Sequence, residues 1–195
     1  IVLTHHHRDH VGAAAWLKAS RGWPILAHPR TQALLEDIVH IDETIGEGRV
    51  LSGSEREDDQ WHVLHTPGHA SGHIVLWEPQ RAGMIGGDMV AAIGTIIVEP
   101  PDGHMATYIG QLRRLAALEP RWLVPAHGEA IEAPVAHLEH YIRHRLGREA
   151  RVRAAGVLGH KAPQQLTVLQ HADADVRVRL DNPRARGVAA VADEV

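Results

Sequence analysis

The sequence predicts an α/β protein in which strands and helices alternate in layers. Its 195 residues are enough for one full domain, and 44% hydrophobic with 23% charged residues is ordinary for a globular protein with a buried core. Short apolar runs rich in β-branched residues are separated by segments whose apolar positions have helical spacing. Strands that alternate with helices in this way are typical of layered α/β architecture.

The N-terminal third of the chain is expected to hold short elements. The apolar run at residues 1–4 predicts a buried strand, and the Ala-rich segment 11–19 predicts a helix. A short strand is expected over 23–27 and a helix over 30–39, where a proline precedes the first helical residue. Residues 42–60 contain glycines and an acidic run, which favours loops and short hairpins.

The remaining elements are longer and more regular. Four apolar runs predict further strands, over 61–65, 73–78, 83–87 and 121–125. One helix is predicted by apolar residues on a single face, namely Tyr108, Leu112, Leu115 and Leu118. A longer helix over 135–155 is predicted by a second stripe, formed by Leu138, Ile142 and Leu146.

The two ends of the chain carry separate expectations. The first residue is Ile, and the apolar run that it opens has the character of a strand already under way, so we expect a fragment of a longer chain. After Gly156 the sequence offers too little apolar surface for an independent core, although residues 163–171 and 183–195 suit short helices. We therefore expect a main domain over residues 1–155 and a partial second domain over 156–195.

A cluster of metal-ligand side chains follows the first apolar run. The chain has 17 His and no Cys, and four of the His lie in the segment Thr4-His5-His6-His7-Arg8-Asp9-His10. Side chains alternate along an extended segment, so His5 and His7 share one side, and a turn can bring Asp9 and His10 to the same pocket. Imidazole and carboxylate groups crowded together indicate a site for divalent cations. A solvated polar loop is the plainer interpretation.

Three later residues fit the same purpose because each follows a predicted strand. His69 ends the turn Thr66-Pro67-Gly68-His69, Asp88 follows two glycines, and His127 lies in the turn Pro125-Ala126-His127-Gly128. A single His after a strand is more often an ordinary surface residue. Three such residues downstream of a His and Asp cluster favour a shared metal site.

Together these residues form a pattern that resembles the metallo-β-lactamase superfamily. Its motif His-x-His-x-Asp-His, with distant His, Asp and His, is intact in this chain. The resemblance implies that His5, His7 and His69 hold a first metal ion and that Asp9, His10 and His127 hold a second. It also implies that Asp88 bridges the two. Because position 88 is Asp rather than Cys, the chain resembles the glyoxalase II and ribonuclease Z members of the superfamily more than the Cys-containing lactamases.

A narrower resemblance is to the beta-lactamase-like protein 2 subgroup, an endoribonuclease group with a small winged-helix-like C-terminal domain. It is carried by the two turns that contain His69 and His127 and by the motif His144-Arg145-x-x-Arg148-Glu149. The strands that normally precede the first motif are not in this sequence, and the tail is short. The resemblance implies an αββα sandwich that lacks its N-terminal strands, followed by a partial winged-helix-like tail.

The implied chemistry is hydrolysis by two metal ions. Ligands that are all nitrogen or oxygen suit zinc best, with manganese and iron as alternatives. Two ions that share a water lower its pKa, and the resulting hydroxide attacks a carbonyl carbon or a phosphorus. From its place in the motif, Asp9 is also expected to orient the hydroxide and manage its proton. His6 and Arg8 are expected to pack beside the ligands, and His73 either to hydrogen-bond near the site or to face solvent.

The net charge and its distribution along the chain do not decide between several classes of substrate. The chain is acidic, with a net charge of −4, which argues against a generally basic nucleic-acid binder. Residues 143–186 nevertheless hold ten Lys and Arg against four acidic residues, either as a solvated helix face or as a surface for a phosphate backbone. The expected substrate is single-stranded RNA, which the subgroup resemblance and this basic segment favour, or a hydrolysable small molecule. The alternatives are a thioester or ester hydrolase of the glyoxalase II type and an inert metal-binding fragment.

Two expectations concern the surroundings of the protein. No apolar run approaches the roughly 18 residues that a membrane-spanning helix needs, so no membrane partner is expected. The absence of Cys suits a reducing compartment, which favours a cytoplasmic location. The oligomeric state stays open.

Overall fold

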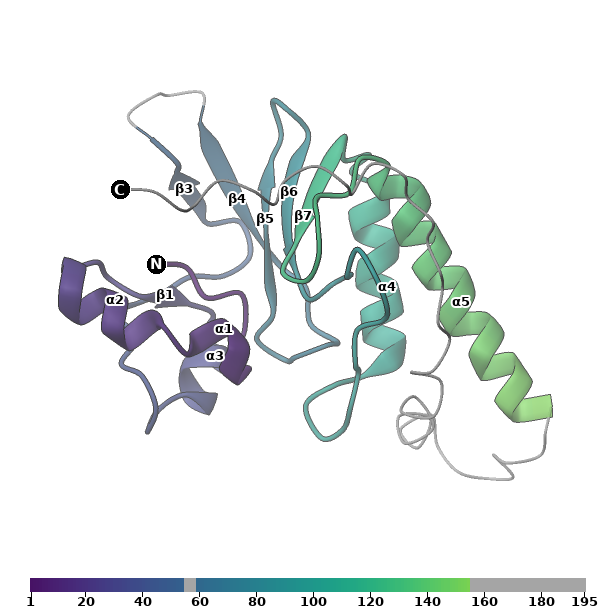
Figure 1. Cartoon of the computed structure of the whole chain (residues 1–195), viewed down its shortest axis with the longest axis horizontal. Helices are drawn as coiled ribbons and strands as arrows, with labels where there is room; N and C mark the ends of the chain where they lie inside the picture. The colour runs from purple at the N-terminus through teal and green to yellow at the C-terminus, as the bar shows by residue number, and fades with distance from the viewer. Residues whose placement is uncertain (55–58, 155–195) are drawn as a thin grey trace, which may run out of the picture.

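The computed structural model describes residues 1–54 and 59–154 of the chain. These residues form two parts, a five-stranded sheet with two long helices and an N-terminal layer of short elements (Figure 1). The N-terminal layer comprises α1 (Arg8–Val11), α2 (Ala14–Arg21), β1 (Leu26–Ala27), α3 (Pro29–Leu34) and β2 (Glu43–Thr44). The second part comprises β3 (Val50–Ser52), β4 (Gln60–His65), β5 (Ile74–Glu78), β6 (Gly83–Gly87), α4 (Met105–Ala116), β7 (Trp122–Pro125) and α5 (Pro134–Ala154).

The direction of the strands determines which residues meet at one edge of the sheet. The strand order is β3-β4-β5-β6-β7, and every neighbouring pair is antiparallel except β6 and β7, which are parallel. Because β5 runs against both β4 and β6, the strands β4, β6 and β7 all point the same way. Their carboxyl ends therefore lie at the same edge of the sheet, and the residues that follow them are brought close together.

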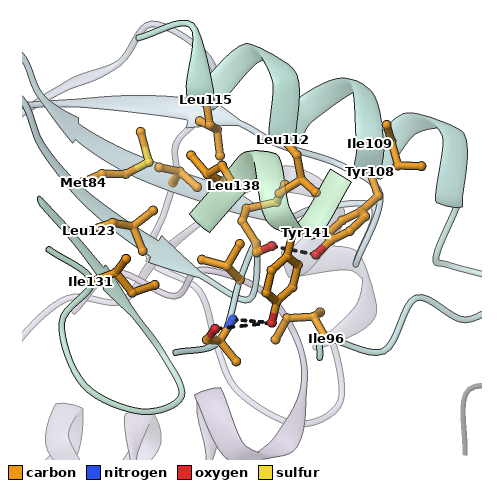
Figure 2. Close-up of a cluster of buried hydrophobic side chains, with 14 of the residues drawn as sticks. Met84, Ile96, Tyr108, Ile109, Leu112, Leu115, Leu123, Ile131, Leu138 and Tyr141 are labelled. Carbon is orange, nitrogen blue, oxygen red and sulfur yellow. Dashed lines mark hydrogen bonds between the residues drawn. The ribbon is translucent and has the colours of Figure 1, made fainter. Parts of the chain in front are cut away.

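The main core lies between the sheet and the two long helices. Alternate residues of the sheet, among them Val75, Met84 and Leu123, face α4 and α5 and are fully buried. Tyr108 and Leu112 of α4 pack against them, and Figure 2 shows buried side chains of this cluster. The helical spacing of the buried residues of α4 is the physical reason for this packing, since it places them on one face.

The N-terminal layer has its own smaller core. Leu3, Ile25 and Leu35 are among the buried residues that hold it together. The backbone N–H of Leu3 donates to the carbonyl of Leu26 at 2.9 Å, and β1 pairs in parallel with β2. The N–H of Ile74 in β5 donates to the carbonyl of Thr4 at 2.9 Å, which fixes the start of the chain beside the sheet. The His-rich segment that follows Thr4 therefore emerges at the edge where β4 and β6 end.

Most predicted elements are present, with four corrections. Residues 1–4 form only an isolated bridge, between Val2 and Leu26, because a single neighbouring strand two residues long offers no longer ladder. The helix expected over 11–19 starts only at Ala14, as α2, because a turn at Gly12 first ends the short helix α1. The helix α3 ends at Leu34 and continues as turns rather than reaching residue 39.

The fourth correction concerns the buried stripe of α5. Leu138 is fully buried and Ile142 is half-buried as expected, but Leu146 is 40% exposed. Tyr141 and Arg145 occupy the buried face instead, because their polar groups reach backbone carbonyls beneath the helix. The helices expected over 163–171 and 183–195, and the partial domain that contains them, lie outside the described residues. Within the part of the chain that is described, no helix is both long and apolar enough to cross a bilayer.

Candidate metal centre

The seven residues expected to hold metal ions converge at one edge of the sheet. Four come from the segment that enters α1, and three follow the carboxyl ends of β4, β6 and β7. Their donor atoms form two groups, each with all atoms within 4.8 Å of one another. One group contains His5, His7, His69 and Asp88, and the other contains Asp9, His10 and His127.

In the first group, three imidazole nitrogens form a small triangle. The Nε2 atom of His5 lies 3.0 Å from Nδ1 of His7, and Nε2 of His69 lies 3.2 Å and 3.0 Å from these two atoms. Oxygen Oδ2 of Asp88 is 3.4 Å from Nε2 of His69. Four donors at these separations surround a common point.

The protonation of this group suits a cation. Nδ1–H of His69 donates to the carbonyl of Ile97 at 2.6 Å, which leaves Nε2 with its lone pair directed into the triangle. Burial, together with the neighbouring imidazoles, holds the pKa of His5 far below its usual value. Burial also lowers the pKa of His7 and of His69. The rings are therefore neutral near pH 7, and their lone pairs repel one another unless a cation lies between them.

The second group is more open to solvent. Oδ2 of Asp9 lies 3.4 Å from Nε2 of His10 and 3.5 Å from Nε2 of His127, and the side chains of Asp9 and His127 are largely exposed. Burial opposes the charged form of His10, but the carboxylates of Asp88 and Asp9 raise its pKa above the usual value overall. One carboxylate and two imidazoles thus face a second common point.

Asp88 faces both groups with different oxygens. Its Oδ2 points to the first group, while its Oδ1 lies 3.4 Å from Nε2 of His10 and 3.4 Å from Nε2 of His127. The carboxyl is buried, yet these imidazoles together keep its pKa below its usual value. A carboxylate in this position is able to contact two cations at once.

The donor set fits a pair of divalent cations. Among the described residues, Nε2 of His10 and Oδ1 of Asp88 are buried and make no hydrogen bond, a state that is costly unless another partner is present. Two nitrogens bound to one tetrahedral zinc ion at ordinary bond lengths lie about 3.3 Å apart. The nitrogen separations of 3.0–3.2 Å in the first group are close to that value.

Two glycines allow the ligand turns to form. Gly68, which precedes His69, has a φ of 136°, and a Cβ there would lie 2.4 Å from the backbone of Tyr108. Gly87, which precedes Asp88, has a φ of 50°, and a Cβ there would lie 2.6 Å from Nε2 of His73. Only glycine combines these conformations with such close neighbours.

His73 is buried and hydrogen-bonds next to the site. The sequence alone leaves open whether it does so or faces solvent. The ring is completely buried, its Nε2 accepts the backbone N–H of Asp88 at 3.0 Å, and its Nδ1 lies 2.8 Å from Oγ1 of Thr66. Burial lowers the pKa of His73 to about 3, so the ring is neutral. Of the two residues expected to pack beside the ligands, His6 is half-buried with Nδ1 3.8 Å from Oδ2 of Asp102, and Arg8 is exposed.

A cavity of about 520 Å³ opens next to the two groups. Beyond the ligand side chains, its wall is formed by the segment between β6 and α4, with Thr95, Ile96, Ile97, Glu99, Pro101 and Asp102. Sequence reasoning missed this wall because no motif marks it. The only signal was the concentration of apolar residues and prolines between two predicted elements. The cavity provides space for a substrate beside the metal-facing atoms.

Comparison with known proteins identifies the class to which this fold and site belong. The family model described as the metallo-beta-lactamase superfamily matches residues 1–127, which include all seven residues of the two groups. The chain belongs to the metallo-beta-lactamase superfamily, whose members are metal-dependent hydrolases. The resemblance expected from the sequence is therefore confirmed.

The chain is similar to several curated proteins. It is 29% identical over 167 residues to a beta-lactamase-like protein 2 homolog of Drosophila melanogaster, covering 78% of this chain and 52% of that protein. It is also 29% identical over 124 residues to a hydroxyacylglutathione hydrolase of Bdellovibrio bacteriovorus, covering 64% of this chain and 46% of the relative. The chain thus spans about half the length of these relatives.

Solved structures share the fold. TTHA1623 in a di-iron-bound form superposes with a TM-score of 0.60 at 28% identity, covering 69% of this chain and 72% of that one. A beta-lactamase domain protein from Burkholderia ambifaria superposes with a TM-score of 0.69 at 22% identity, covering 79% and 56%. The α/β fold expected from the sequence is that of the metallo-beta-lactamases.

Proposed function

We propose that this chain carries the active site of a hydrolase that uses two divalent metal ions. His5, His7 and His69 hold the first ion, Asp9, His10 and His127 hold the second, and Asp88 bridges them. The observation that carries the proposal is the position of Asp88, whose two oxygens face the two groups at 3.4 Å from their nearest imidazole nitrogens. A carboxylate that bound only one ion, or that only stabilised the fold, would not need one oxygen directed at each group.

The donor chemistry sets the choice of metal. All proposed ligands are nitrogen or oxygen, a set that suits zinc and also accepts iron or manganese. The di-iron form of TTHA1623 supports iron as an alternative. When bound, two such cations supply a water activated for attack near neutral pH and stabilise the charge that develops on the leaving atom.

The protein groups around that chemistry have distinct tasks. Asp9 is exposed to the cavity, with Oδ2 between His10 and His127, so its carboxylate orients the attacking water and accepts its proton. The Ile97 carbonyl fixes the ring of His69, and His73 fixes the backbone of Asp88. These hydrogen bonds hold the ligands in place before substrate arrives.

The cavity wall favours a small ester or thioester as substrate. Its residues beyond the ligands are neutral or acidic, with Glu99 and Asp102 as the charged ones and no Lys or Arg among the described lining residues. A phosphodiester chain would place the charges beyond its reacting group against these carboxylates, whereas a small ester would not. The similarity to a hydroxyacylglutathione hydrolase supports the same choice.

Single-stranded RNA is the second candidate. Arg143, Arg151 and Arg153 are exposed on α5 and could attract a phosphate backbone outside the cavity. Turnover of S-lactoylglutathione or p-nitrophenyl acetate, compared with bis(p-nitrophenyl) phosphate and a labelled RNA, separates the two. Faster hydrolysis of the phosphodiesters would reject the ester assignment. Two bound ions without turnover of any of them would favour an inert metal-binding chain.

The metal assignment is tested by replacing the bridging carboxylate. Asp88→Asn is expected to lower zinc affinity by more than about 100-fold, since loss of a ligand costs more than loss of an outer partner. Metal analysis after dialysis should then fall from two ions per chain toward zero, together with any hydrolysis. Asp37→Asn, at an exposed position in a turn, is the matched control and should keep both ions. Retention of two ions by Asp88→Asn would contradict the bridging role.

A further inference from the structure

One backbone segment joins all three ligands that lie on the sheet side of the site. This wall segment, residues 89–98, starts directly after Asp88, and its residues 95–97 line the cavity. The N–H of Ala92 donates to the carbonyl of His127 at 2.9 Å. The carbonyl of Ile97 accepts the Nδ1–H of His69 at 2.6 Å. A displacement of the wall segment would therefore be transmitted to each of these ligands.

The wall segment has no regular secondary structure, and α5 holds it with three side chains. Nε2–H of His137 donates to the carbonyl of Ala91 at 2.9 Å. The hydroxyl of Tyr141 accepts the N–H of Ala91 at 3.0 Å and donates to the carbonyl of Gly94 at 2.9 Å. The guanidinium of Arg145 donates to the carbonyl of Ile96. Residues four apart share one helical face, so these side chains form a row over the segment.

Of the three residues in this row, Arg145 is the one that stability alone does not explain. Its side chain is buried, with 5% of the residue exposed, and its charge lies 5.8 Å from the centre of the Tyr108 ring. Within the described residues its Nε atom makes no hydrogen bond. A buried charge with such partners is costly, and an apolar side chain would fill the space at lower cost.

Tyr108 completes the arrangement from α4. Its hydroxyl donates to the carbonyl of Met89 at 2.7 Å, near the start of the wall segment. Figure 2 shows Tyr108 and Tyr141 with their hydroxyls directed at the backbone below the helices, and Ile96 beside Tyr141. The wall segment is thus fixed near both ends, by Tyr108 at Met89 and by Arg145 at Ile96.

We infer that Arg145 is a positioning residue of the metal centre. By holding the Ile96 carbonyl, it places the next carbonyl, that of Ile97, where it orients the ring of His69 and directs Nε2 to the first group of donors. The same contact sets the position of the cavity wall. This inference rests on the proposed function, and it assigns a task to α5, which supplies none of the candidate ligands or described lining residues of the cavity.

The test compares Arg145→Met and Arg145→Lys with the control Arg143→Met, an exposed position on the same helix. Arg145→Met should weaken zinc binding about tenfold in a chelator competition, the lower end of the range for outer partners of metal ligands. Arg145→Lys should recover part of that loss, and Arg143→Met should leave zinc affinity unchanged. Equal zinc affinity in Arg145→Met and the parent chain would overturn the inference.

A second readout separates this inference from the proposed function. In the metal-free chain, the Nδ1–H proton of His69 should give a nuclear magnetic resonance signal typical of a hydrogen-bonded imidazole. Arg145→Met should shift that signal or broaden it beyond detection, while Arg143→Met should not. If the parent chain binds no metal, the proposed function fails, but this signal still decides the role of Arg145.

Should Arg145→Met fail to fold, Tyr141→Phe tests the same row by removing a single hydroxyl. It should weaken zinc binding by two- to fivefold and shift the His69 signal. A folded Tyr141→Phe with the zinc affinity and His69 signal of the parent chain would count against the inference.

Discussion

His73 shows how strongly the metal-facing residues depend on a residue outside the ligand set. Its neutral ring links the turn that follows β4, through Thr66, to the backbone of Asp88. The link explains why a fully buried imidazole is kept between two ligand-bearing turns. It also explains why the sequence left His73 undecided, since a His at the start of a strand carries no sign of what it faces.

Replacement of His73 should therefore weaken the site without removing a ligand. His73→Ala leaves the N–H of Asp88 and the hydroxyl of Thr66 unpaired in the interior, at a cost to unfolding free energy of about 1–3 kcal/mol. Zinc affinity should fall by about 10- to 100-fold. His73→Gln, which keeps a donor and an acceptor, should recover part of both losses. His40→Ala, at an exposed position, is the control; an unchanged zinc affinity in His73→Ala would contradict this role.

At the scale of elements, the turns that end the strands determine where the ligands lie. Gly68 brings the turn after β4 against the first residues of α4, where the N–H of His104 donates to the carbonyl of Gly68 at 2.7 Å. This contact places His69 at the level of the His-rich segment. The position of one ligand thus depends on the close approach of a turn and a helix.

Gly68→Ala should destabilise the fold by more than about 1 kcal/mol, because the new Cβ meets the backbone of Tyr108 and the φ of 136° disfavours alanine. The matched control is Gly110→Ala within α4, where a Cβ meets nothing within 4 Å. That change should raise stability by about 0.5–1 kcal/mol. Chemical denaturation measures both, and a Gly68→Ala protein as stable as the parent would contradict the account.

A second element-scale prediction concerns the start of α3. Nδ1 of His28 accepts the N–H of Arg30 and so caps the helix, and the ring stacks on His65 with centroids 4.0 Å apart. Burial, with His65 and Arg30 nearby, lowers the pKa of His28 to about 4. The folded state thus favours the neutral ring, and the stability that it contributes is present above the unfolded pKa of about 6.5.

This contribution should be lost as the pH falls from about 6.5 to about 4. His28→Asn keeps a capping oxygen but does not titrate, so its unfolding free energy should fall less than that of the parent chain between pH 7 and pH 5. Denaturation of the metal-free proteins at both pH values measures the difference. Identical pH dependence would show that His28 does not carry the effect.

The elements with regular apolar spacing could be predicted from the sequence, and the irregular ones could not. The strand predicted over 83–87 is β6, and the helix marked by Tyr108 and Leu112 is α4. The seven candidate ligands were visible because their spacing and their place after strands are local features. The wall segment was not visible, and Arg145 was marked only as part of a motif, because the contact between them joins residues about 50 positions apart and depends on where α5 packs.

At the scale of the whole molecule, the site lies where the two parts of the structure meet. The N-terminal layer supplies His5, His7, Asp9 and His10, while the sheet side supplies His69, Asp88 and His127. Ions bound between them would add to the apolar contacts that join the parts, such as those among Ile45, Val63 and Ile74. Metal binding should therefore contribute to the stability of the fold as well as to chemistry.

Removal of metal should lower the melting temperature by roughly 10 °C. A ligand held at about a thousandfold above its dissociation constant stabilises the folded state by about 4 kcal/mol, and each kcal/mol shifts the midpoint by about 2–4 °C for a chain of this size. Thermal unfolding with and without a chelator measures the shift. Asp88→Asn should show little response, and an equal response in that variant would place the stabilising ions elsewhere.

The donor residues are far apart in the sequence, and this has a consequence for biosynthesis. The His-rich segment leaves the ribosome first, whereas His127 is added more than a hundred residues later. At ordinary elongation rates this interval lasts on the order of ten seconds, during which a nascent chain has imidazoles but no β7 to complete the second group. With the ligands assigned as proposed, loading with both cations would follow translation of β7, and a truncated nascent chain that stops before it would retain at most one ion.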